Sequence, residues 1–210
     1  MSLRISQGFK ALVLASAVFG MVACGSDNNN NGGNGTLDPG TGTGNPSTDT
    51  QTTSNEVQAT TQTGVQQAAA SSAQLKLATV DTSVACSGGG TAQVTGEVNS
   101  GSPSTFDLDF DLDGCTNLDG VVNVNGQYNL ASDSYEYSYT ITGEVGGNGC
   151  IVTFTSYLVD ISIPDFTNPL SYTLLLDGAI GGECTGGDTT CDYDNVTVEN
   201  GVVSGTPVCN

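Results

Sequence analysis

The sequence predicts an all-β domain, an antiparallel meander of about eight strands that closes as a barrel or folds as a sandwich. Between residues 81 and 210, apolar and polar residues alternate with a period of two, which is typical of strands with one buried face. Pairs of Gly, Asn, Asp and Pro separate these runs and indicate turns. The same region holds an even number of cysteines, which favours disulfides. A disordered tether and a short helix precede it.

The N-terminus has the layout of an export signal. Arg4 and Lys10 precede an apolar run that is shorter than the ~20 residues of a membrane-spanning helix. The run ends in Met21-Val22-Ala23-Cys24, which resembles the lipobox of bacterial lipoproteins. The resemblance implies that the signal is cut before Cys24, whose sulfur takes a diacylglycerol and whose amino group is acylated. An ordinary secretory signal with a chance cysteine is the alternative.

On this interpretation, acylated Cys24 holds the protein in a lipid bilayer, and two or more chains give the stable anchoring that one chain does not. Gly25 stands where lipoproteins kept at the inner membrane carry Asp, so the resemblance implies the outer membrane of a Gram-negative-type cell envelope. The sequence therefore divides into residues 1–23 (signal peptide), 24–55 (lipidated cysteine and disordered tether), 56–80 (short helix) and 81–210 (disulfide-braced β domain).

The tether is predicted from its composition. Residues 24–55 are mainly Asn, Gly, Thr, Ser, Asp and Pro, and Leu37 is their only large apolar residue. Such a stretch buries too little apolar surface to offset the entropy lost on folding. We therefore expect it to be disordered.

A short helix is predicted next. Thr53 and Glu56 have the spacing of a capping box, and a thin apolar stripe that includes Val57 and Val65 follows. Gly64 and the many threonines weaken the helix. Because the stripe is poor, the helix should form only by docking on the β domain.

The strands are clearest at residues 106–113, 122–125 and 135–141, where apolar residues alternate with Asp, Asn, or Ser and Thr. Residues 151–163 and 172–180 are more apolar on both faces, so they should lie deeper or under the helix. Tyr residues at 135, 137 and 139 share the parity of Ile141. Core packing is therefore expected for them rather than a carbohydrate platform.

The cysteine spacing predicts how the hairpins are crosslinked. Cys150 and Cys184 are equidistant from a turn at Thr167, so they should lie opposite each other across one hairpin. The other four cysteines are nearly symmetric about turns at Gly101 and Asn200. We therefore predict the disulfides Cys86–Cys115, Cys150–Cys184 and Cys191–Cys209.

The hairpin register raises a question about Asp160. An unbroken register places Leu158 opposite Leu176 and turns Asp160 inward, as a carboxylate with a raised pKa. A bulge near Ser156 would turn Asp160 outward and Val159 inward. We favour the bulge.

Charge and composition exclude several functions. The chain has 22 acidic and three basic residues, and after removal of the signal only Lys76 remains basic, which gives a net charge of −21. A field of that sign repels nucleic acid. There is no histidine for a catalytic triad or a zinc site, and no P-loop. We therefore expect a protein that is not an enzyme and has no cofactor.

One motif suggests a metal ion. Residues 109–114 satisfy the opening D-x-D-x-D-G of a calcium loop, which gives Asp109, Asp111, Asp113, Asn117 and Asp119 as ligands for Ca²⁺. Gly120 stands where an EF-hand places its bidentate glutamate. The alternative is a strand with an acidic outer face that ends in an Asp-Gly turn.

These observations favour a non-catalytic envelope lipoprotein with a structural or protein-interaction role. The alternative is a binding module that presents a site for lipid, glycan or calcium, and a ligand cavity in the β domain would separate the two. A carboxylate-dependent glycan hydrolase is a minor alternative.

Overall fold

The computed structural model describes residues 37–72, 77–130, 134–164, 172–199 and 202–210. One helix, α2 (Pro46–Ser72), precedes ten strands in this part of the chain. The strands are β1 (Leu77–Ala85), β2 (Thr91–Asn99), β3 (Ser104–Asp111), β4 (Leu118–Leu130), β5 (Tyr135–Gly147), β6 (Cys150–Ile163), β7 (Thr173–Cys184), β8 (Gly187–Glu199), β9 (Val202–Ser204) and β10 (Val208–Cys209).

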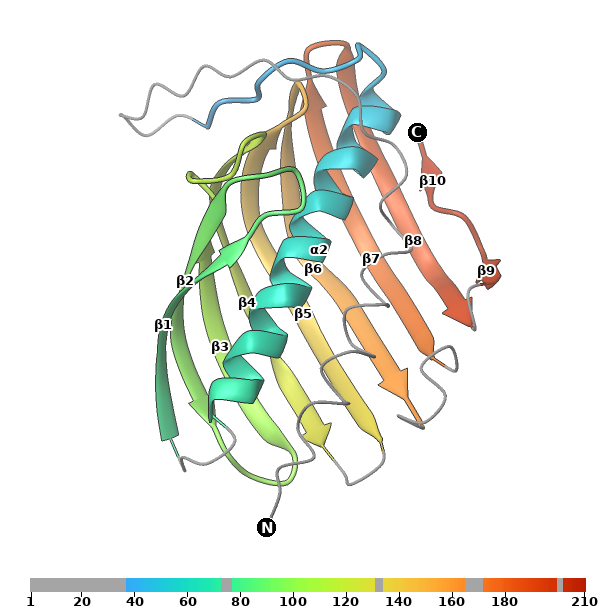
Figure 1. Cartoon of the computed structure of the whole chain (residues 1–210). Coiled ribbons are helices and arrows are strands. Elements are labelled where there is room, and N and C mark those ends of the chain that lie inside the picture. Colours follow the sequence, from blue (N-terminus) through green and yellow to red (C-terminus); the bar gives the residue numbers. More distant parts are fainter. Residues whose placement is uncertain (1–36, 73–76, 131–133, 165–171, 200–201) are drawn as a thin grey trace.

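The predicted antiparallel meander is confirmed. Each strand from β1 to β8 pairs with the next along the chain, and β9 and β10 both pair with β8. The strands form one sheet that curls strongly, like part of a barrel (Figure 1). Among the described strands the two edges do not pair with each other, so the barrel is not closed.

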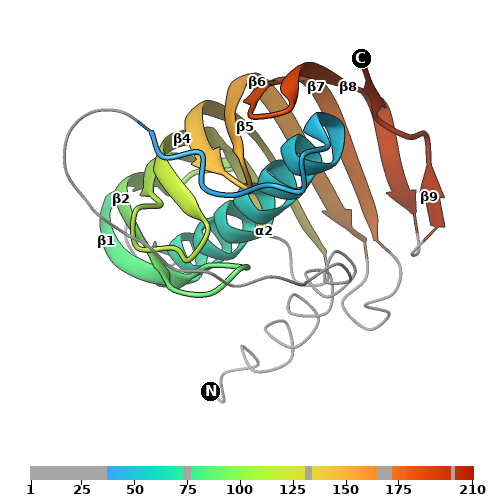
Figure 2. The same ribbon diagram turned by 90° about the horizontal axis from the view of Figure 1, so that it is seen from above.

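The helix α2 lies across the concave side of the sheet, which wraps around it (Figure 2). It contacts β1 and β2 at one end of the sheet and β4 to β8 over the rest. The helix itself was predicted, but it begins at Pro46 and ends at Ser72 rather than spanning 56–80. Among the described residues, no helix is both long enough and apolar enough to cross a membrane.

The early start of α2 has a physical cause. The Asn45 side chain accepts a hydrogen bond from the Thr48 amide, as an N-cap does. The Asp49 carboxylate accepts bonds from the amides of Thr43 and Gly44, which fixes the approach of the preceding loop. Residues 37–55 are therefore ordered, which corrects the predicted extent of the tether. Residues 24–36, with Cys24 and the signal, lie outside the described residues.

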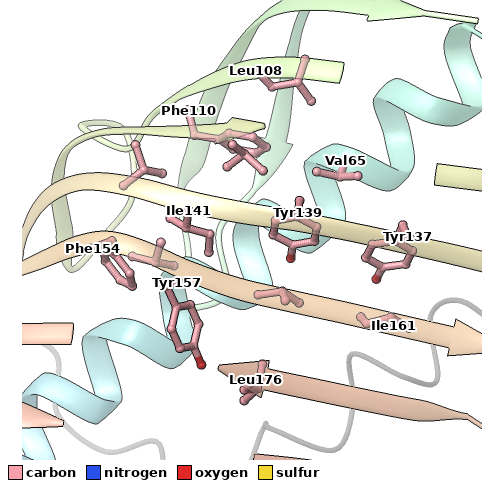
Figure 3. Close-up of a cluster of buried hydrophobic side chains, with 14 of the residues drawn as sticks. Val65, Leu108, Phe110, Tyr137, Tyr139, Ile141, Phe154, Tyr157, Ile161 and Leu176 are labelled. Carbon is pink, nitrogen blue, oxygen red and sulfur yellow. The ribbon is translucent and has the colours of Figure 1, made fainter. Parts of the chain in front are cut away.

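The core fills the space between the sheet and α2. Leu108, Phe110 and Ile141 on the inward face of the sheet are fully buried, and Val65 of α2 packs into the same cluster (Figure 3). The three tyrosines of β5, at 135, 137 and 139, are buried on this face too. Their predicted role in the core is confirmed.

The three disulfides agree with the predicted pairing: Cys86–Cys115, Cys150–Cys184 and Cys191–Cys209. The first joins the β1–β2 turn to the β3–β4 turn. The second links paired residues of β6 and β7, and the third links paired residues of β8 and β10. Each bond therefore fastens neighbouring parts of the sheet.

The predicted bulge near Ser156 is confirmed. The register of β6 against β7 shifts between Phe154 and Leu158, so that Val159, not Leu158, lies opposite Leu176. Beyond the shift Val159 is fully buried, and Asp160 lies on the outer face, half-buried. The extra residue thus keeps a carboxylate out of the core.

Candidate functional site

The convex, solvent-facing side of β1 to β5, here called the outer face, carries polar side chains in rows that cross the strands. The strand register brings together one carboxylate-rich row and, beside it, a second. The first row is Asp81, Thr95, Asp109, Asn123 and Thr142, and the second is Thr79, Glu97, Asp107, Asn125 and Thr140.

Hydrogen bonds between strands order this surface. The Asn123 amide donates to Asp107 Oδ1 at 2.7 Å and to Asp109 Oδ1 at 3.0 Å, so one amide holds two carboxylates of β3. On the next strands the Gln93 amide donates to Asp81 Oδ1 at 2.6 Å. Because these carboxylates are already held in place, they lose less conformational entropy than mobile side chains when a partner binds them.

The outer face also contains a like-charge pair. Glu97 and Asp107 are directly opposite each other on β2 and β3, and both are exposed. Like charges in directly opposed positions destabilise a sheet. No basic residue of the described chain offsets them, because Lys76, the last basic residue of the sequence, lies outside the described part. A cationic group from a partner would relieve this repulsion.

Two shallow depressions lie side by side on this face. The larger, about 610 Å³, runs between the row of Glu97, Asp107 and Asn125 and the neighbouring row that includes Gln127 and Ser138. The smaller, about 320 Å³, lies on the other side of Gln127 and Ser138. Both are open, and polar and apolar surface line them in similar measure, so they suit contact with an extended ligand better than enclosure of a small apolar one.

The smaller depression contains the half-buried Asp160. Burial raises the pKa of its carboxyl group, and the neighbouring Glu136 carboxylate raises that pKa further. Asp160 is therefore more easily protonated than an ordinary aspartate, although it does not face the core.

The predicted calcium ligands lie at the end of β3, in the loop after it and at the start of β4, and the carboxylates accept hydrogen bonds from other groups of the protein. Asp111 Oδ1 accepts a hydrogen bond from the Asp113 amide, and Asp113 Oδ1 accepts one from the Gly120 amide. Asp119 Oδ2 accepts a bond from the Asp38 amide at 2.6 Å. Asn117 is half-buried nearby.

The carboxylates of this loop are not gathered around one point. In the described part of the chain, no three or more His, Cys, Asp or Glu side chains are placed to hold a metal ion. The sequence motif therefore forms an acidic strand end with a hydrogen-bonded turn, as its alternative interpretation had it. Calcium binding stays a prediction that titration can test.

Sequence reasoning missed the rows themselves. The alternation in residues 106–113 placed the aspartates on one face, but the partners Glu97 and Asn125 follow only from the register of three strands. The Asn123–Asn125 alternation was the signal available, because amides facing outward on the next strand are natural partners of carboxylates.

Scans of the chain against protein-family models, curated proteins and solved structures found no match.

Proposed function

We propose that this chain is a non-catalytic lipoprotein of the bacterial cell envelope, anchored through acylated Cys24, and that its outer face binds a protein partner. The observation that carries the proposal is the ordered array of carboxylates and amides across β1 to β5. Its like-charge pair, Glu97 and Asp107, favours a partner that brings basic groups. The disulfides support the same proposal, because they are expected in an exported protein.

The interior supports a surface role as well. The concave side of the sheet is filled by α2 and the core, and the two depressions described above are on the outer face. A binding module that encloses its ligand would need a cavity inside the curled sheet, and α2 and the core fill that space. The proposed partner therefore meets the sheet from outside.

The anchor is tested by mass spectrometry of the protein extracted from its own membranes. The mature chain should begin at Cys24 and carry the mass of its acyl groups, and Cys24→Ser should leave the signal attached and the lipid absent. A mature chain that begins elsewhere, or carries no lipid, overturns the anchoring part of the proposal.

The partner surface is tested by photo-crosslinking in intact cells. A crosslinkable residue replaces Asn125 on the outer face, and a matched one replaces Thr190, which is exposed on β8 away from the rows. A defined crosslinked protein is expected from position 125 alone, and the yield should fall in the double variant Glu97→Gln, Asp107→Asn. Equal crosslinking from both positions, or none, contradicts the proposal.

A glycan is the second candidate ligand, and the polar depression beside Gln127 and Ser138 favours it. The amides, hydroxyls and carboxylates among its lining residues match the groups that bind sugar hydroxyls. Binding of a soluble glycan that is lost in Gln127→Ala and kept in Thr190→Ala would select this candidate.

A further inference from the structure

The two edges of the sheet are built differently. At one edge two short strands pair with β8, β9 with three residues and β10 with two, and the disulfide Cys191–Cys209 fastens β10. Very short edge strands are one means by which proteins keep a sheet from pairing with another chain. At the opposite edge (Figure 1) no strand of the described chain pairs with β1 on the side away from β2. This nine-residue strand is here called the β1 edge.

The pairing of β1 with β2 fixes which backbone groups face the open side. The Cys86 amide donates to the Gly90 carbonyl just beyond the strand, and the register from there back to Leu77 is unbroken. In an antiparallel pair, the backbone groups of successive residues point alternately toward the partner strand and away from it. Cys86 points toward β2, so every second residue before it points away. These residues are Leu77, Thr79, Asp81, Ser83 and Ala85.

The side chains of the β1 edge alternate in the same way. Those of the five residues that point away from β2 are exposed, whereas the intervening Ala78, Val80 and Val84 are buried. An antiparallel strand added here would therefore place alternate side chains on the outer face and the others on the inner side. No register shift interrupts β1, whereas shifts do interrupt β6 and β7. The edge thus lacks the bulge that would oppose such pairing.

A carboxylate stands at the middle of the β1 edge. The Gln93 amide donates to Asp81 Oδ1 at 2.6 Å, and the Ser83 hydroxyl donates to Gln93 Oε1 at 2.9 Å. These two bonds hold the carboxylate in place on the outer face. Opposite charges in directly facing positions stabilise a pair of strands. A strand with lysine or arginine opposite Asp81 is therefore favoured over a neutral one.

The same carboxylate disfavours a second copy of the chain as the occupant. Two β1 strands paired antiparallel in full register would place Asp81 opposite Asp81. Like charges in this position destabilise the pair, and the chain's net charge of −19 adds repulsion between copies. A shifted register separates the two aspartates but shortens the ladder.

We propose that the β1 edge binds an extended segment of a partner protein, which adds to the sheet as an antiparallel strand with lysine or arginine opposite Asp81. Backbone hydrogen bonds along the edge supply the contact, and the basic side chain sets the register. Apolar side chains of the segment lie on the inner side, beside Val80 and Val84. This edge is distinct from the outer face, so the proposal goes beyond the function proposed there and does not depend on it.

The first experiment measures amide exchange of the full-length protein by NMR. The amides of Thr79 and Asp81 should exchange at least tenfold faster than those of Val80 and Thr82, because only the latter two donate to β2. Equal protection of both sets would show that another segment already occupies the edge, which overturns the proposal.

The second experiment offers the edge a strand. The probe is a fluorescent nine-residue peptide in which threonine and valine alternate, with lysine in place of the central threonine and N-methyl groups on the valines to prevent its self-association. In 0.15 M salt it should bind the full-length protein and slow exchange of the Thr79 and Asp81 amides at least tenfold. Asp81→Asn should weaken binding about two- to fivefold. Asp109→Asn, two strands away in the same row, is the matched control and should leave binding unchanged.

A second peptide separates strand pairing from simple charge attraction. Moving the N-methyl groups from the valines to the threonines and lysine keeps the charge and sequence but blocks the N–H groups that would face β1. This peptide should not bind. Equal binding of the two peptides contradicts the proposal, as does failure of the first to bind. Protection of the Thr79 and Asp81 amides that grows with protein concentration alone also overturns it, because the occupant is then a second copy.

Discussion

Gly64→Ala tests how closely α2 is packed on the sheet. In an exposed helix this change is favourable by about 1 kcal/mol, because alanine has the higher helix propensity. Here the added Cβ would lie 2.6 Å from Phe110 Cζ and 3.4 Å from Val94 Cγ2. The Phe110 ring is fully buried, so it has no free space into which to move.

The two effects can be weighed. Overpacking a core costs about 1–3 kcal/mol, and a contact this short belongs at the upper end. We expect a net loss of about 2 kcal/mol in the free energy of unfolding, measured by urea denaturation at constant m-value. Thr63→Ala, at a half-buried neighbour, is the control and should leave stability unchanged or slightly higher.

A double-mutant cycle locates the strain. Phe110→Leu removes the ring that the new methyl group meets, so the loss from Gly64→Ala should become smaller in that background. If Gly64→Ala stabilises the protein as it would an exposed helix, then α2 does not approach the sheet as closely as described, and the reasoning is refuted.

Three further predictions concern buried polar groups and crosslinks. Burial raises the pKa of Glu56 above its unfolded value, so ionised Glu56 lowers stability at neutral pH, and this loss disappears as pH falls toward about 4.5. The stability difference between Glu56→Gln and wild type, measured by urea unfolding, should therefore shrink from pH 7 to pH 4.5. The control Glu97→Gln, at an exposed position, should show no such trend. Tyr135→Phe removes an unpaired hydroxyl and should leave the melting temperature unchanged or higher. Tyr137→Phe loses the hydrogen bond from Gln66 and should lower the melting temperature by several degrees. Equal losses in the two variants would contradict this prediction. The pair Cys150→Ala, Cys184→Ala opens a loop of 34 residues and should cost about 3–4 kcal/mol in denaturant unfolding; a cost near zero would show that the bond does not brace the sheet.

The β domain could be predicted from sequence because its information is local. Alternation in residues 106–113 and 135–141 gives the inward face directly, and turn residues give the hairpin order. In a meander each strand pairs with its neighbour, so Cys150 and Cys184 could be paired by counting from one turn. The Ser156 bulge followed from the cost of turning Asp160 inward.

The rows on the outer face were harder to predict from sequence, because they depend on the pairing registers of several strands at once. Glu97, Asp107 and Asn125 become one row only when three strands are aligned without error. A one-residue slip in any of them moves a side chain to the other face. The calcium motif shows the converse, since a matching string such as residues 109–114 does not specify that its oxygens converge.

The start of α2 could not be predicted from sequence patterns, and the reason is physical. Residues 46–55 are mostly threonine and serine, whose ordinary preference is for caps, turns and solvent, so composition placed them in the tether. In the structure the sheet overrides that preference, and Thr53 and Ser54 are fully buried. Local preference and global fold therefore disagree along one side of α2 and agree across the sheet. Such disagreement costs stability, and in natural proteins it tends to persist where a function requires it. Gln58 is the plainest case, because neither atom of its buried amide has a hydrogen-bond partner among the described residues. Gln58→Leu should therefore raise the free energy of unfolding, and a fall instead would contradict this account.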